Sequence, residues 1–73
     1  MKTPDLSMTI ALILKGEDLS GFEKLTKDKV LFIFNDSESL TGNQELYWRK
    51  EVEAPIQTTM SIMRMVKAKL KRL

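Results

Sequence analysis

Lys29-Val30-Leu31-Phe32-Ile33-Phe34-Asn35-Asp36 contains five consecutive apolar residues, and four of the five are aromatic or β-branched. A run of this length and composition predicts a buried β-strand over about residues 29–35. Side chains alternate along a strand, so Val30, Phe32 and Phe34 face one side, and Leu31 and Ile33 face the other. Because both sets are apolar, we expect helices or a neighbouring layer to cover much of this strand.

A weaker strand is predicted just before it, over about residues 18–25. Thr26-Lys27-Asp28 is a polar turn between the two runs, which indicates an antiparallel hairpin. Gly21 within the weaker strand marks either a bulge or a place where a helix lies close to the backbone.

Three helices are predicted, over about residues 4–15, 37–48 and 55–72. Thr3 can cap the first helix, Pro4 suits its first position, and Gly16 ends it. Asp36 or Ser37 can cap the second, and Gly42 with Asn43 in its middle can interrupt it.

Pro55 opens the third helix. Its apolar residues recur at spacings of three and four and define a predicted buried stripe of Ile56, Met60, Met63, Val66, Leu70 and Leu73. Ile62 and Met65 lie outside this stripe and broaden it.

This order of helix, strand, strand, helix and helix predicts a small single α+β domain spanning residues 1–73. The helices would pack on one face of the hairpin, or on a larger sheet that is completed by pairing in a dimer.

Composition narrows the function classes. The chain has no cysteine and no histidine, which removes the commonest metal ligands and the side chain that titrates near neutral pH. We therefore expect no metal, no cofactor and no enzymatic activity. The closest acidic pairs, Asp36 with Glu38 and Glu51 with Glu53, fit a helix cap and a solvated linker better than an acid–base or metal site.

The longest apolar run, Ile10 to Leu14, is far shorter than the roughly 20 residues that a membrane-spanning helix needs. No secretory cleavage pattern follows it, so a cytoplasmic location is the expectation.

Charge is unevenly distributed along the chain. Residues 1–35 balance to zero, residues 36–53 carry a net charge of −3, and residues 54–73 carry +5 with no acidic side chain. Arg64, Lys67 and Lys71 share one flank of the third helix, and Lys69 and Arg72 lie elsewhere on its last turns. These cations can contact DNA or RNA phosphates, or an anionic membrane surface. The alternative is that they complement the helix dipole and keep the helix soluble.

Tyr47-Trp48-Arg49-Lys50 places two aromatic residues beside two cations. Trp48 can stack on an unpaired base while Arg49 and Lys50 contact phosphates. The competing interpretation is that one ring anchors the second helix to the core. Adjacent helical residues point about 100° apart, so both rings cannot be equally buried.

A flexible apolar strip on the third helix offers a second candidate surface. Methionine adapts to varied partners, so the strip suits a partner protein or a homodimer, although it can equally fill gaps in the core. The strip consists of Met60, Met63, Met65, Leu70 and Leu73.

Several short motifs resemble a family of short uncharacterised proteins from bacteriophages and integrative mobile elements, a domain of unknown function. The motifs are Thr3-Pro4-Asp5-Leu6, Lys15-Gly16, Leu19 with Gly21, Phe32-Ile33-Phe34-Asn35-Asp36, Tyr47-Trp48 and Val52-Glu53-Ala54-Pro55. Thr41-Gly42-Asn43 departs from the acidic, continuous helix that family members carry before the Tyr-Trp pair. The resemblance implies a mobile-element context and supplies no catalytic residues.

The sequence thus predicts a small non-enzymatic accessory protein that binds nucleic acid through its basic C-terminal helix. The alternative is a protein-binding module, or an inhibitor of a host factor, that uses the apolar strip of the same helix.

Overall fold

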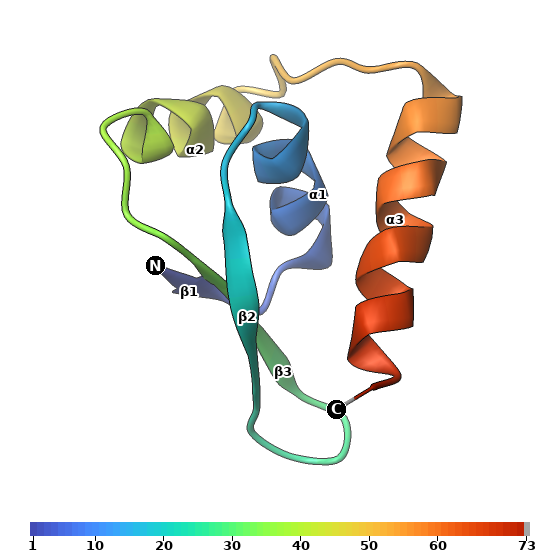
Figure 1. Cartoon of the computed structure of the whole chain (residues 1–73). Coiled ribbons are helices and arrows are strands. Elements are labelled where there is room, and N and C mark those ends of the chain that lie inside the picture. The colour runs from blue at the N-terminus through green and yellow to red at the C-terminus, as the bar shows by residue number, and fades with distance from the viewer. Residues whose placement is uncertain (73) are drawn as a thin grey trace.

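In the computed structural model, which describes residues 1–72, a short additional strand precedes the predicted order of helix, two strands and two helices (Figure 1). The elements are β1 (Lys2–Thr3), α1 (Leu6–Leu14), β2 (Leu19–Lys24), β3 (Val30–Phe34), α2 (Leu40–Trp48) and α3 (Ile56–Leu70). The predicted α+β fold, with helices packed on an antiparallel hairpin, is confirmed.

β3 is the central strand of a three-stranded antiparallel sheet, with β1 on one side and β2 on the other. Phe22 of β2 pairs with Phe32 of β3, and their rings meet edge to face with centroids 5.7 Å apart. The register shifts between Leu19 and Gly21, so the bulge is the correct one of the two alternatives for Gly21. The third strand comes from the same chain.

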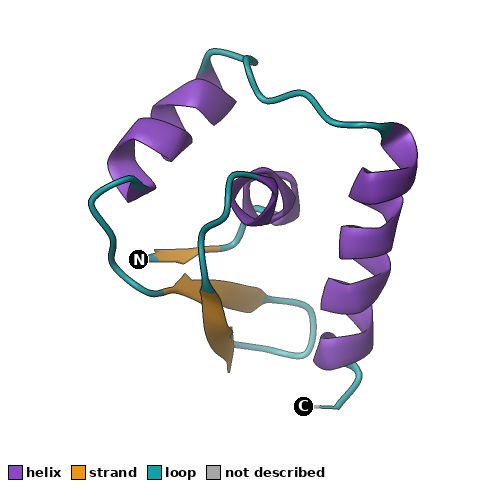
Figure 2. Cartoon of the chain, turned by 45° about the horizontal axis from the view of Figure 1, so that its top comes forward, coloured by secondary structure: helices purple, strands orange, loops and turns teal. Residues whose placement is uncertain are grey.

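The helices lie on one face of the sheet (Figure 2). Phe32 and Phe34 point to this face and are 4% and 2% exposed. The core that they form also contains Met8, Leu12, Leu40 and Val66. Of the two faces of β3, the one that carries Phe32 and Phe34 therefore faces the core.

The other face of the sheet is not covered by any helix of residues 1–72, contrary to the expectation from two apolar sets. Leu31 and Ile33 are half-buried there. Lys2 of β1 and Glu23 of β2 form an ion pair of 2.8 Å that crosses β3 on this face. The aliphatic stems of the two charged residues supply cover that a second layer would otherwise provide.

α1 begins later than predicted. Thr3 belongs to β1, where it pairs with Phe32, and Asp5 is the N-cap, with its Oδ1 accepting a hydrogen bond from the Met8 amide at 3.2 Å. The assignment of Thr3 as cap and Pro4 as first helical residue is wrong, because pairing with β3 keeps the backbone before Pro4 extended. The Thr3 hydroxyl instead accepts a hydrogen bond from the Asp5 amide at 3.2 Å.

α2 begins at Leu40, with Ser39 as its N-cap, so neither Asp36 nor Ser37 caps it as predicted. The Ser39 side chain makes no capping hydrogen bond, because its hydroxyl donates to a carboxylate at the end of α1. The helix continues without interruption through Gly42.

α1 and α2 both end at a residue in the left-handed conformation. Gly16 has a φ of 89°, as its role as helix stop predicts, and the next amide reaches the Leu12 carbonyl at 2.9 Å. Lys50 has a φ of 60°, and the next amide reaches the Leu46 carbonyl at 2.9 Å. A residue with a Cβ is strained by roughly 1–2 kcal/mol in this conformation.

α3 follows Pro55, as predicted, and packs beside α1. Val66 is fully buried, and Ile62 and Leu70 pack against the core. The predicted stripe is wrong in the first half of the helix, because Ile56 is 75% exposed whereas Ile62, placed outside the stripe, is inside. At about 100° per residue, Ile56 lies about 80° around the helix axis from Val66. Within residues 1–72, no helix has the length and apolar character to cross a bilayer.

Candidate nucleic-acid interface

The second half of α3 presents its cations to solvent. Ile62, Val66 and Leu70 hold one side of the helix against the core, so the basic positions between them face outward. Arg64, Lys67 and the C-cap Lys71 lie within about 60° of one another around the axis, Lys69 lies on the opposite flank, and Arg72 follows the end of the helix. All five side chains are exposed.

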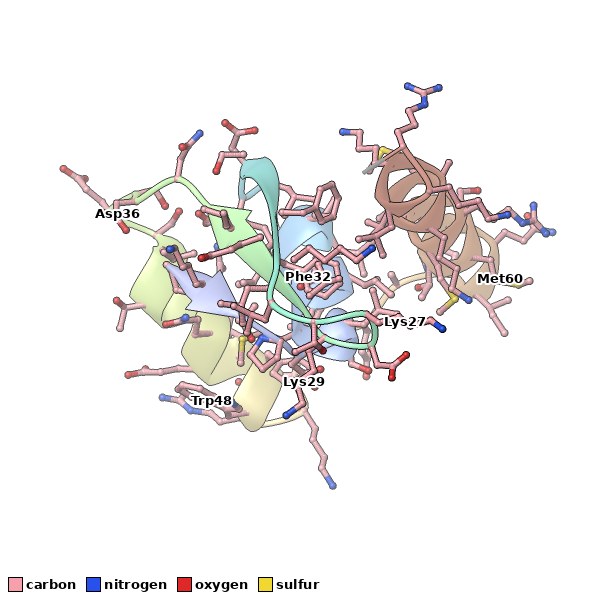
Figure 3. All side chains as sticks on the ribbon, turned by 90° about the horizontal axis from the view of Figure 1, so that it is seen from below. Lys27, Lys29, Phe32, Asp36, Trp48 and Met60 are labelled. Carbon is pink, nitrogen blue, oxygen red and sulfur yellow. The ribbon has the colours of Figure 1, made fainter. Side chains whose placement is uncertain are left out.

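Three further lysines lie in and next to the β2–β3 turn, and the sequence analysis did not assign them to the site. The Thr26 hydroxyl accepts hydrogen bonds from the Asp28 and Lys29 amides at 3.3 and 3.1 Å, which fixes the turn. Lys24, Lys27 and Lys29 are exposed around it. The turn lies next to the C-terminal end of α3 (Figures 1 and 2). Lys27 extends from the turn on the side of α3, whereas Lys29 points away from α3 (Figure 3).

The two segments together form one strongly basic end of the molecule. We call it the basic edge, and it comprises Lys24, Lys27, Lys29, Arg64, Lys67, Lys69, Lys71 and Arg72. It holds eight of the twelve basic residues and, with Asp28, one of the ten acidic residues, so it carries a net charge of +7 and the rest of the chain −5. None of the eight forms an ion pair within residues 1–72. Asp36 lies far from this edge (Figure 3).

The structure does not bring Trp48, Arg49 and Lys50 together with the basic edge. They lie at the end of α2, whereas the last turns of α3 are at the other end of the molecule (Figures 1 and 3). Arg49 is partly neutralised by ion pairs with Glu45 at 3.4 Å and Glu51 at 4.0 Å. Trp48 is 63% exposed, so the two aromatic residues do differ in burial.

Tyr47 is the ring that anchors α2, and it packs against the core. Its hydroxyl donates a hydrogen bond to Asp5 Oδ2 at 3.1 Å, which connects the end of α2 to the start of α1. Burial of the ring, followed by the hydrogen bond and charge of Asp5, raises the pKa of Tyr47 above its usual value. This pair has a structural role in holding α2 against α1.

A buried carboxylate connects the opposite ends of the same two helices. Glu17, just after α1, is 8% exposed and accepts hydrogen bonds from Ser37, Ser39 and Asn43 at 2.5, 2.6 and 2.5 Å. The serine hydrogen bonds lower the pKa of Glu17, and the Asn43 amide acts in the same direction. Within residues 1–72, no cluster of acidic side chains suitable for a metal ion occurs. The sequence analysis missed Glu17, because its donors lie at least 20 residues away.

The methionine strip is divided between different sides of α3. Met60 and Met65 are 44% and 41% exposed and lie about 140° apart around the helix axis. Met63 is half-buried, and Leu70 packs against the core. Leu73 lies outside the described residues. Ile56 and Met60 therefore form the exposed apolar part of one flank, and that flank continues into the basic edge.

A mostly apolar hollow of about 270 Å³ lies between α1, the end of α2 and the start of α3. Its lining includes Ile10, Leu14, Tyr47, Val52 and Thr59. The Tyr47 hydroxyl is already engaged by Asp5, so Ser7, Lys50 and Thr59 are the polar residues left in this mostly apolar lining.

Comparison of the chain with protein-family models, with curated proteins and with solved structures gives no match.

Proposed function

We propose that this protein is a non-enzymatic nucleic-acid-binding protein that contacts phosphates through the basic edge. The observation that carries the proposal is the meeting of the β2–β3 turn and the end of α3, two segments that are far apart in the sequence (Figure 1). Unpaired lysine and arginine side chains on one surface release counterions when they neutralise phosphates. The resemblance to proteins of bacteriophages and mobile elements adds a setting in which small proteins often handle DNA, regulate transcription or inhibit a host machine.

The solubility explanation accounts for only part of this surface. Lys67 and Lys69 lie in the last turn of α3, where they complement the helix dipole. Lys24 ends β2, and Lys27 and Lys29 lie in and next to the β2–β3 turn, so none of the three has a helix end to complement. Keeping five unpaired cations at one helix end and three beside it raises their mutual repulsion, which a polyanionic ligand would relieve.

The second candidate function is binding of a partner protein, or of a second copy of this chain, through the exposed apolar flank of α3. The observation that favours it is the exposure of Ile56 and Met60, at 75% and 44%, on neighbouring turns. Salt separates the two candidates, because phosphate binding weakens steeply as salt rises, whereas apolar docking hardly changes.

The test is the fluorescence anisotropy of labelled oligonucleotides titrated with the protein at about 50 and 200 mM salt, a range over which six to ten phosphate contacts lose roughly 10³–10⁵ in affinity. We expect binding at the lower salt that weakens at the higher. The variant in which Arg64, Lys67 and Lys71 are all replaced by Gln should bind more weakly, and its log–log salt slope should fall by about one per contact that is lost.

A charge-matched control is available at the other end of the molecule. Replacement of Lys15, Arg49 and Lys50 by Gln removes the same three charges but leaves the basic edge intact. The proposal predicts that this control keeps most of the affinity and the full salt slope. Equal losses in the two triple variants would mean that net charge, and not the basic edge, causes binding. No binding at the lower salt would reject the function itself.

A further inference from the structure

The aromatic residues of this chain are all engaged elsewhere or lie away from the basic edge. Phe32 and Phe34 are buried, and Phe22 packs edge to face on Phe32. Tyr47 contacts the core and Asp5. Trp48, with 63% of its surface exposed, lies at the end of α2, away from the last turns of α3 (Figure 3).

The surface around the β2–β3 turn likewise has no aromatic ring on which a base could stack. A hollow of about 460 Å³ next to the turn is lined by Pro4, Leu25, Asp28, Lys29, Val30 and Leu31, none of which is aromatic. Leu25 is 52% exposed there, but an aliphatic side chain offers no π-face to a base. The basic edge therefore presents cations and aliphatic groups to a ligand.

Single-stranded and duplex nucleic acids differ in what they need from such a surface. Proteins that bind single strands gain much of their affinity by stacking bases on aromatic rings. A duplex keeps its bases stacked internally and offers one charge per roughly 1.7 Å of its axis, twice the density of one strand. Two adjacent basic segments without rings suit the duplex.

We propose that the ligand of the basic edge is duplex nucleic acid, held through its phosphates. This inference rests on the proposed function and names its substrate class. Each phosphate contact releases about 0.9 counterions from B-DNA and about 0.7 from a single strand. With about five contacts, the difference is about one power of the salt concentration, or roughly twentyfold in affinity at 50 mM.

The experiment compares one labelled strand of about 20 nucleotides, alone and annealed to its complement, by anisotropy at 50 mM salt. A DNA duplex and an RNA duplex of the same sequence form separate arms, because both present phosphate pairs across a groove. We expect at least one duplex to bind at least tenfold more tightly than the single strand. The Trp48→Ala variant should bind the duplex with unchanged affinity.

The failures of the two proposals are distinguishable. A single strand that binds as tightly as both duplexes would overturn the duplex assignment and leave the function standing. A loss of single-strand binding in Trp48→Ala would then place that site at the end of α2. Absence of binding to any of the oligonucleotides would overturn the proposed function itself.

Discussion

Gly16 and Gly42 should respond in opposite directions to the same change, replacement by alanine. Gly42 lies inside α2 with an ordinary helical backbone, and a Cβ there would meet no atom within 4 Å. Alanine is favoured over glycine by about 0.8–1.0 kcal/mol in a helix interior; Gly42 lies in the first turn of α2, so Gly42→Ala should stabilise the fold by up to about that amount. Gly16 also has open space around it, but its φ of 89° strains any residue with a Cβ.

The expected cost of Gly16→Ala follows from that strain. The left-handed conformation costs alanine roughly 1–2 kcal/mol, and the smaller entropy of the unfolded chain returns about 0.4–1 kcal/mol. The net effect is a destabilisation of about 1 kcal/mol. For a domain of this size, each change should shift the thermal midpoint by about 4–8 °C, upward for Gly42→Ala and downward for Gly16→Ala.

The assay is urea unfolding followed by far-UV circular dichroism, because the exposed Trp48 is a poor fluorescence reporter of folding. The slope m should be equal in the two variants and the parent, so that the midpoints report stability directly. A destabilising Gly42→Ala would show that α2 is not continuous through this position. A neutral Gly16→Ala would show that the left-handed turn after α1 is not required.

Three further predictions concern stability. The pKa of Glu17 is lowered in the folded protein, so the stability that its carboxylate contributes is present above the unfolded pKa of 4.5 and is lost as the pH falls through the folded pKa. Glu17→Gln should therefore make the loss of stability at acid pH less steep in pH-dependent unfolding, and an unchanged loss would contradict the role of the buried carboxylate. Lys50→Gly should raise the free energy of unfolding by roughly 0.5–1 kcal/mol because its φ of 60° suits glycine, and a decrease in urea unfolding would count against that strain. Val66→Ala should lower the free energy of unfolding by about 2 kcal/mol, whereas Ile56→Ala at the exposed start of α3 should change it by less than about 0.5 kcal/mol. Similar losses in the two variants would mean that Ile56 is buried, as the stripe predicted from sequence requires.

The parts of the fold that the sequence predicts correctly are those carried by long or unambiguous local signals. The apolar run of β3 is long enough to show both its period and its turn boundaries. Gly16 and Pro55 mark a helix end and a helix start through backbone constraints that do not depend on the rest of the fold. β1 has two residues, too few to show any periodicity, and is held only by its pairing with β3.

The helix caps were mispredicted because tertiary partners compete for the same side chains. Ser37 and Ser39 are good capping residues in isolation, yet both hydroxyls donate to Glu17. Asp5, and not Thr3, caps α1, and its other carboxylate oxygen accepts a hydrogen bond from the Tyr47 hydroxyl. A reading of local propensity cannot weigh partners that lie 20 or more residues away.

In the candidate site, too, some residues are evident from the local sequence and others only from the fold. The cations in and just after α3 lie close together in the sequence, so the last 20 residues of the chain are enough to predict them as a group. Lys24, Lys27 and Lys29 belong to a stretch whose charge is balanced locally, and only the folding of the hairpin turn against the end of α3 makes them part of the same surface (Figure 2). Trp48 joined the predicted site through its neighbours in sequence, and the fold separates it from the basic edge.

If the β2–β3 turn and α3 act as one phosphate-binding surface, removal of the turn lysines alone should weaken binding. The variant with Lys24, Lys27 and Lys29 replaced by Gln is titrated against a labelled duplex at salt concentrations from about 50 to 200 mM. We expect weaker binding and a log–log salt slope that is lower by about one for each lysine that contacts a phosphate. An affinity and a slope equal to those of the parent protein would contradict it, because the turn would then take no part in binding.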